Sequence, residues 1–145
     1  MSDIIDIRFP AHDDLVVLGR TVAGTVGVRA GFSIEEVEDL RLAVDELCLW
    51  ALATPGGPDV AVRFERDAEV VTVACRRTGS PDAGAPEDGG AGGPVADGAG
   101  SLDGGMTQQE LSRQILVALV GEGQVQLGDD SGPPSIRMRA GGSRP

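Results

Sequence analysis

A carboxylate in the middle of an amphipathic stretch is the group of this chain best placed to do chemistry. Glu46 lies in the run Asp39-Leu40-Arg41-Leu42-Ala43-Val44-Asp45-Glu46-Leu47-Cys48. A carboxylate on a helix beside a cleft can act as a general base that polarises a hydroxyl or a water molecule. The spacing alone would equally allow Glu46 to be a polar residue at the edge of a helix, so its neighbours must decide.

Trp50 follows Glu46 by one helical turn and limits what that chemistry can be. An indole offers one N–H donor and no hard oxygen ligand, so Trp50 cannot bind Mg²⁺. As the single Trp of the chain, it can be a core or interface aromatic. At a partly exposed position, Trp is also a frequent hot spot of protein–protein binding.

Capping boxes predict where two helices begin. Ser33 is followed three residues later by Glu36, and Thr107 by Glu110, so that side chain and backbone can satisfy each other at each helix start. We expect helices over 13–30, 33–53 and from 107 onward. Their predicted inward stripes are Leu15, Leu18, Val22 and Val26; Leu40, Val44, Leu47 and Ala51; and Leu111, Ile115 and Leu119.

Alternating apolar and polar residues predict strands over 5–9, 60–64 and 71–75, and two shorter ones near 125–127 and 136–138. The stretch 78–105 holds ten of the 22 glycines and five acids, with no basic residue, and predicts a flexible loop. Residues 140–145 are expected to fray. The order predicts one domain, 1–145, of α/β (α+β) class: a two-layer sandwich with helices on one face of a mixed, mostly antiparallel sheet.

The motif around Glu46 resembles that of the histidine-kinase-like (GHKL) ATPases, and among them the RsbW-type anti-sigma factors that are also serine kinases. Their pattern is roughly Asp-Leu-Arg/Lys-Leu-Ala-Val-x-Glu-x-Cys-x-Asn-Ala, which 39–48 follows closely. The resemblance implies a Bergerat-type fold and a general-base role for Glu46. It also implies that Trp50 stands where the family has its Mg²⁺-binding Asn.

The family's second motif is altered as well. In relatives, the strand equivalent to 71–75 leads into Asp-x-Gly-x-Gly, whose Asp accepts a hydrogen bond from the adenine amino group. Here Arg77 stands at the Asp position and only Gly79 of the motif remains. Glu46, Trp50, Arg77 and Gly79 are therefore degenerate nucleotide-pocket positions. We expect no bound cofactor and no metal site, with ATP and Mg²⁺ as ligands only if the pocket still works.

The resemblance implies partners rather than a small-molecule substrate. We expect an anti-sigma factor that sequesters an alternative RNA polymerase sigma factor and is controlled by a STAS-domain anti-anti-sigma antagonist. Members of the family usually form homodimers, so we expect a homodimer here. The positions expected to face the sigma factor are Arg20, Thr21, Gly24 and Arg29. Two alternatives stay open: an active Mg-ATP-dependent serine kinase that phosphorylates the antagonist, and a protein that only sequesters an antagonist.

Charge and composition exclude other classes. The formal net charge is −11 and the twelve basic residues are all Arg, without a basic cluster; direct binding to nucleic acid or to an anionic membrane is disfavoured. A basic protein surface is the better electrostatic match. The N-terminal residues lack the features of a signal peptide, so we expect a cytoplasmic protein. Cys48 and Cys75 are interpreted as buried core cysteines rather than a disulfide.

Overall fold

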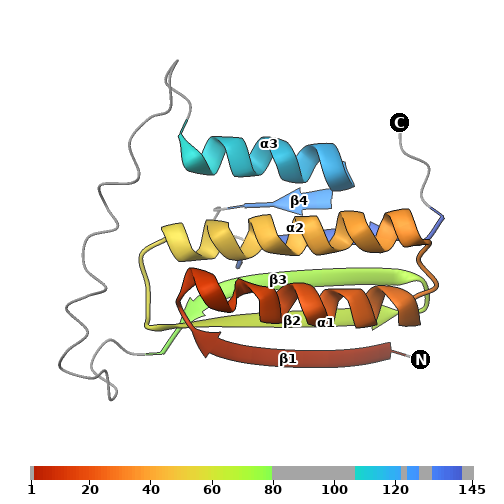
Figure 1. Cartoon of the computed structure of the whole chain (residues 1–145), viewed down its shortest axis with the longest axis horizontal. Coiled ribbons are helices and arrows are strands. Elements are labelled where there is room, and N and C mark those ends of the chain that lie inside the picture. The colour runs from red at the N-terminus through yellow and green to blue at the C-terminus, as the bar shows by residue number, and fades with distance from the viewer. Residues whose placement is uncertain (1, 80–106, 122–123, 128–131, 142–145) are drawn as a thin grey trace.

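Three helices cover one face of a five-stranded sheet (Figure 1). The computed structural model describes residues 2–79, 107–121, 124–127 and 132–141. The sheet order is β1-β2-β3-β5-β4, and all four strand pairs among these residues are antiparallel. The strands are β1 (Ser2–Pro10), β2 (Asp59–Asp67), β3 (Val70–Thr78), β4 (Val125–Gln126) and β5 (Ser135–Arg139). This α+β sandwich confirms the predicted fold class, with a sheet that is antiparallel rather than mixed.

The inner face of the sheet is the apolar half of the predicted alternation. In register, Ile5 lies opposite Phe64 and Ile7 opposite Val62, while Val73 joins Phe64 to Ile136 of β5. The buried members of this face are Phe9, Val60, Val62, Phe64, Val71, Val73, Cys75 and Ile136. Because side chains alternate across a strand, this face packs on the helices and the polar residues point away.

The helix layer consists of α1 (Val16–Arg29), α2 (Ile34–Ala53) and α3 (Gln108–Val120), with a short 3₁₀ turn η1 (Asp13–Leu15) before α1. Both predicted capping boxes are present. The Ser33 hydroxyl accepts from the backbone N–H of Glu36, and the Glu36 carboxylate accepts from the backbone N–H of Ser33. Thr107 and Glu110 do the same at α3. The predicted stripe of α2 is buried along its length.

The inward face of α1 differs from the prediction. Gly19, Ala23, Val26 and Gly27 are buried, whereas Leu18 is 45% exposed. A β-carbon on Gly19 would lie 3.3 Å from Val44 Cγ1, and one on Gly27 would lie 3.3 Å from Leu40 Cδ2. The glycines therefore bring the backbone of α1 close to α2. Of the predicted stripe, Val26 is buried and Leu15 and Val22 are partly buried against the core, and Leu18 alone is exposed.

Other differences are local. On α3 the fully buried residues are Ser112 and Leu116, while the predicted stripe of Leu111, Ile115 and Leu119 is only partly buried. The predicted loop and tail also begin later than expected, because Thr78 still belongs to β3, and Ala140 and Gly141 donate backbone hydrogen bonds to Glu69 O and Glu36 Oε1. The remainder of both segments lies outside the described residues. None of the described helices has the length and apolar character needed to span a bilayer.

Candidate functional site

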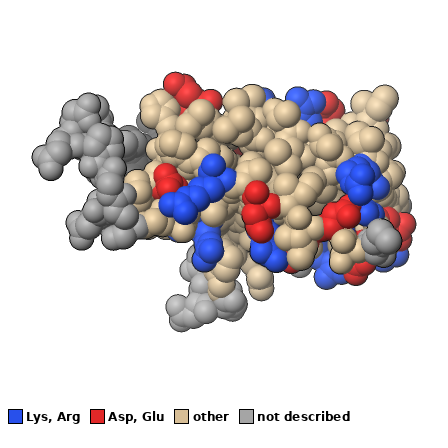
Figure 2. Space-filling model, turned by 90° about the horizontal axis from the view of Figure 1, so that it is seen from below, with Lys and Arg blue, Asp and Glu red and all other residues tan. Residues whose placement is uncertain are grey.

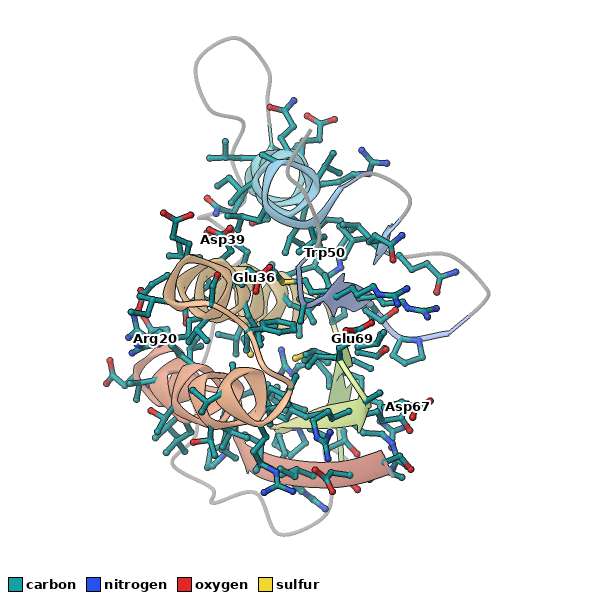
Figure 3. The ribbon with its side chains drawn as sticks, turned by 90° about the vertical axis from the view of Figure 1, so that its right-hand side faces the viewer. Arg20, Glu36, Asp39, Trp50, Asp67 and Glu69 are labelled. Atoms are coloured by element: carbon teal, nitrogen blue, oxygen red, sulfur yellow. The ribbon has the colours of Figure 1, made fainter. Side chains whose placement is uncertain are left out.

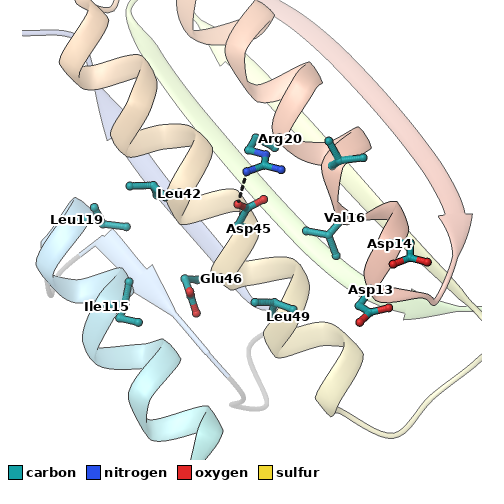
Figure 4. A pocket seen from close by; sticks show the side chains of 11 residues that line it. Asp13, Asp14, Val16, Arg20, Leu42, Asp45, Glu46, Leu49, Ile115 and Leu119 are labelled. Atoms are coloured by element: carbon teal, nitrogen blue, oxygen red, sulfur yellow. Dashed lines mark ion pairs between the residues drawn. The ribbon is translucent and has the colours of Figure 1, made fainter.

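Glu46 faces a cavity of about 370 Å³ that opens across the helix layer (Figure 4). We call it the three-helix cavity. It lies over the middle of α2, with η1 and the start of α1 on one side and α3 on the other. Its charged lining residues are Asp13, Asp14, Arg20, Asp45 and Glu46, and its apolar ones are Val16, Val17, Leu42, Leu49, Ile115 and Leu119.

Two carboxylate oxygens in this lining have no hydrogen-bond partner among the described residues. They are Asp45 Oδ1 and Glu46 Oε2, and both atoms are shielded from solvent. An unpaired buried acceptor is costly, by about 1–3 kcal/mol for a neutral group and more for a charged one. Most buried polar atoms in native proteins are paired. A buried donor, Nε of Arg41, lies one turn earlier on α2 than Asp45 and likewise has no partner among the described residues.

The other oxygen of Asp45 forms an ion pair with α1. Arg20 NH1 from α1 lies 3.3 Å from Asp45 Oδ2, the ion pair drawn in Figure 4. Burial raises the pKa of Asp45, and the nearby guanidinium groups of Arg20 and Arg41 only partly oppose that effect. The positive charges near Asp45 thus do not fully offset the cost of burying its negative charge.

Arg77, predicted to stand at the adenine-binding Asp position, lies near the C-terminal end of α2. Its guanidinium donates to three backbone carbonyls: Gly57 O at 2.7 Å, and Leu52 O and Thr54 O at 3.2 Å each. These carbonyls belong to the end of α2 and the turn that follows it. Since the last carbonyls of a helix lack internal partners, Arg77 supplies their cap from a neighbouring strand.

The turn after α2 is also pressed against the end of β3. A β-carbon on Gly56 would collide with the side chain of Arg77, and one on Gly57 with the carbonyls of Thr78 and Gly79. Gly79 itself has a φ of +86°, a region that favours glycine. The residual Gly79 of the altered motif therefore serves a close backbone approach.

The residues at the nucleotide-pocket positions do not fit Mg-ATP. Trp50 is half-buried on α2 (Figure 3), and its side chain has no oxygen with which to bind Mg²⁺. Arg77 has no acceptor for an adenine amino group, and its donors are already bound to backbone carbonyls. The structure brings Trp50 and Arg77 together through Thr54, whose hydroxyl donates to Trp50 O at 2.9 Å. Glu46 lies one turn away, in the cavity.

The four predicted sigma-facing residues do not form one uniform surface. Arg20 turns toward α2 and the cavity, and Gly24 packs near the Arg41 side chain. Thr21 is exposed, with its hydroxyl donating to Val17 O at 2.8 Å. Arg29 is bound to Asp3 Oδ2 of β1, which Arg66 also contacts. Sequence reasoning missed the exposed apolar residues beside them, Val17, Leu18 and Val28.

The charges on the β1 side of the molecule are mixed in sign (Figure 2). Pairs such as Arg8–Asp59 and Arg63–Asp6 place basic and acidic groups side by side.

Near η1, the exposed His12, Asp13 and Asp14 bring three ligand-type atoms within 4.8 Å of one another. In the core, Cys48 Sγ and Cys75 Sγ lie 3.9 Å apart as free, fully buried thiols.

Comparison with known proteins finds similarity to serine-protein kinases called RsbW. The chain is 46% identical over 70 residues to the RsbW of Listeria monocytogenes, which is 48% of this chain and 41% of that protein. It is 41% identical over 68 residues to that of Bacillus pumilus and 33% identical over 67 residues to that of Bacillus subtilis. Each of these two matches covers 43% of this chain and 42% of the relative. The chain thus spans about two fifths of the length of these relatives, and no family model matches it.

Proposed function

We propose that this chain is an RsbW-like anti-sigma factor of a partner-switching system, working in the cytoplasm. In this proposal it sequesters an alternative sigma factor, and a STAS-domain anti-anti-sigma protein competes for it. The similarity to RsbW proteins supports the family, and the fold is consistent with a GHKL-like sandwich. The partners and a homodimeric state are part of the proposal.

We further propose that ATP binding and kinase activity have been lost. The observation that carries this step is Arg77, whose guanidinium is bound to three carbonyls at the end of α2. Phosphoryl transfer depends on positioning and on Mg²⁺ neutralising the phosphates, and Trp50 provides no ligand for that ion. The protein would then act through protein–protein recognition alone.

An ATP titration with and without Mg²⁺ tests the loss of nucleotide binding. Isothermal calorimetry gives one readout and the fluorescence of Trp50 another, because it is the single Trp of the chain. We expect no saturable binding up to millimolar ATP. Saturable, Mg²⁺-dependent binding in both readouts would reject the proposed loss.

Reciprocal pull-downs with the sigma factors and STAS proteins of the source organism test the partners. Capture of a sigma factor that the STAS protein displaces is the expected result. Capture of a STAS protein but of no sigma factor would reject the anti-sigma role and leave a protein that only sequesters an antagonist. Sedimentation of the purified chain tests the homodimer.

An active serine kinase is the second candidate, because Glu46 retains a free carboxylate oxygen at the cavity. In that case Glu46 would act as the general base toward a serine of the antagonist. A phosphotransfer assay with labelled Mg-ATP and the antagonist distinguishes the two. Incorporation of label that disappears in Glu46→Gln would establish the kinase.

A further inference from the structure

We propose that the three-helix cavity binds the guanidinium of an arginine side chain that a protein partner presents, with Glu46 and Asp45 as its acceptors. The first observation is the balance of charge in the lining. Among the described lining residues, four carboxylates, those of Asp13, Asp14, Asp45 and Glu46, face one cation, Arg20. Arg41 lies near Asp45 but outside the lining. Such a cavity attracts a positive group and repels an anion such as a triphosphate.

The second observation is the pair of buried oxygens without a donor. Arg20 forms an ion pair with one oxygen of Asp45, and the atoms Asp45 Oδ1 and Glu46 Oε2 have no partner among the described residues. Figure 4 shows Asp45 turned toward α1 and Glu46 toward α3, so the two carboxylates approach the cavity from both sides of α2. A ligand with several N–H donors and a positive charge satisfies these acceptors, whereas a hydroxyl satisfies one.

The undescribed residues of this chain are a poor source of that cation. Of the twelve arginines, Arg144 alone lies outside the described residues, and there is no lysine. The segment 80–106, which precedes α3, contains five acids and no basic residue. A second molecule is therefore the better donor.

The shape and walls of the cavity favour an arginine over a bare ion or a larger ligand. Its volume of about 370 Å³ is at the low end of the roughly 300–1,000 Å³ that small-molecule sites occupy. Leu42, Leu49 and Ile115 provide apolar walls, which suit the aliphatic stem and the weakly hydrated guanidinium plane of arginine better than a strongly hydrated ammonium.

Exposed apolar side chains around the opening favour a protein as the source. Val17 is 44% exposed and Leu42 50% exposed, and both belong to the lining. Leu18, at 45%, is the next residue of α1. Arginine is enriched at protein interfaces and among their binding hot spots. The inference rests on the proposed function in one respect, because it requires a protein partner to present the arginine.

Binding of short peptides to the whole chain tests the site without the natural partner. The probe is Ac-Leu-Arg-Leu-NH₂, followed by ¹H–¹⁵N chemical-shift titration. The matched peptide with citrulline has the same shape but no charge, and the lysine peptide has the charge without the planar fork. We expect saturable shifts centred on 45–46 and 115–119 with the arginine peptide, binding at least about tenfold weaker with lysine, and no saturation with citrulline.

Substitutions then connect binding to the two acceptors. Glu46→Gln keeps the shape of the side chain, and we expect it to weaken the arginine peptide about tenfold or more, the scale of one charged hydrogen bond. Asp67→Asn is the matched control, because Asp67 is an exposed acid on the sheet side, away from Arg20 (Figure 3). It changes the net charge equally and should change affinity less than about twofold.

Several outcomes would overturn the inference. Equal binding of the citrulline peptide would exclude a charge-dependent site, and equal effects of the two substitutions would indicate only non-specific attraction to an acidic protein. Tighter binding of the free polyamine spermidine than of the arginine peptide would reject a protein-borne guanidinium. If no peptide binds while the wild-type protein still captures a sigma factor, the cavity proposal fails and the proposed function stands.

Discussion

Removing the guanidinium of Arg77 should destabilise the protein, because this group caps the end of α2 from a different element. Arg77→Met retains the aliphatic stem and deletes the three hydrogen bonds to Gly57 O, Leu52 O and Thr54 O. The change leaves helix-terminal carbonyls without their donor in a partly buried setting. It therefore tests whether Arg77 has a structural role at the former adenine position.

The magnitude follows from the geometry. A hydrogen bond to a charged group contributes about 1.5–3 kcal/mol, and a cation at a helix C-terminus about 0.3–1 kcal/mol. The three bonds share one donor group and are partly open to solvent, so their contributions are not additive. Counting the 2.7 Å bond to Gly57 O at full value and the other two at a fraction, we expect a loss of about 3 kcal/mol in the free energy of unfolding.

Urea unfolding followed by circular dichroism measures this loss. Arg76→Met is the matched control, because Arg76 is the adjacent arginine on the exposed side of β3 and should cost less than about 0.5 kcal/mol. Arg77→Lys should lie between the wild type and Arg77→Met, since an ammonium can reach some of the carbonyls. If Arg77→Met and Arg76→Met unfold at the same urea concentration, the capping role assigned to Arg77 is wrong.

Substitutions at three further residues test the electrostatics and the core. Burial raises the pKa of Asp45, so stability should fall as pH rises from 3.8 through that higher folded value. Asp45→Asn should remove this dependence of the free energy of unfolding on pH. Measured by urea titration at neutral pH, the variant should be more stable than the wild type. Arg29 and Arg66 lower the pKa of Asp3, so Asp3→Asn should be destabilised at neutral pH, with a difference that shrinks as pH falls below 3.8; a constant difference would contradict this. Cys48→Ala should cost about 1 kcal/mol, and Cys48→Ser more, because a hydroxyl would be buried. The native thiols should resist DTNB until unfolding; rapid modification would contradict their burial.

The helix starts and the sheet could be predicted because their signals are local. Ser33 with Glu36, and Thr107 with Glu110, satisfy backbone groups within one turn, so no tertiary information is needed. The same holds for the alternation at 60–64 and 71–75, whose period of two is a property of the strand itself. Each of these predictions is confirmed by the hydrogen bonds and register of the structure.

The packing face of α1 could not be predicted in the same way. The helical spacing favoured Leu15, Leu18, Val22 and Val26 as the inward stripe. Val26 is buried and Leu15 and Val22 pack partly buried against the core, but Leu18 is exposed and the buried line also contains Gly19 and Gly27. A glycine carries no hydrophobic signal, although its missing side chain allows the backbone to approach Val44 and Leu40. The information lies in the shape of the partner helix, which the sequence of α1 does not contain.

The three-helix cavity was likewise outside the reach of the sequence. Glu46 was identified from its motif, but nothing along the chain places Asp13 and Ile115 beside it, since they lie on elements far apart in sequence. The structure also separates the predicted nucleotide-pocket residues into two groups. Near the C-terminal end of α2, Thr54 accepts from Arg77 and donates to the Trp50 carbonyl. Glu46 instead faces the cavity with an oxygen that has no partner among the described residues.

This separation has a consequence for any attempt to restore nucleotide binding. Arg77→Asp would regain the family's adenine acceptor, but it would also remove the cap of α2 and place a carboxylate beside helix-terminal carbonyls, both of which are unfavourable. Trp50→Asn lacks this penalty, because the contact described for Trp50 is made by its backbone carbonyl with Thr54. Arg77 therefore combines the predicted absence of an adenine-binding Asp with the observed cap of α2. A return to ATP binding at this position requires a second donor for Leu52 O and Gly57 O, in addition to the two motif residues.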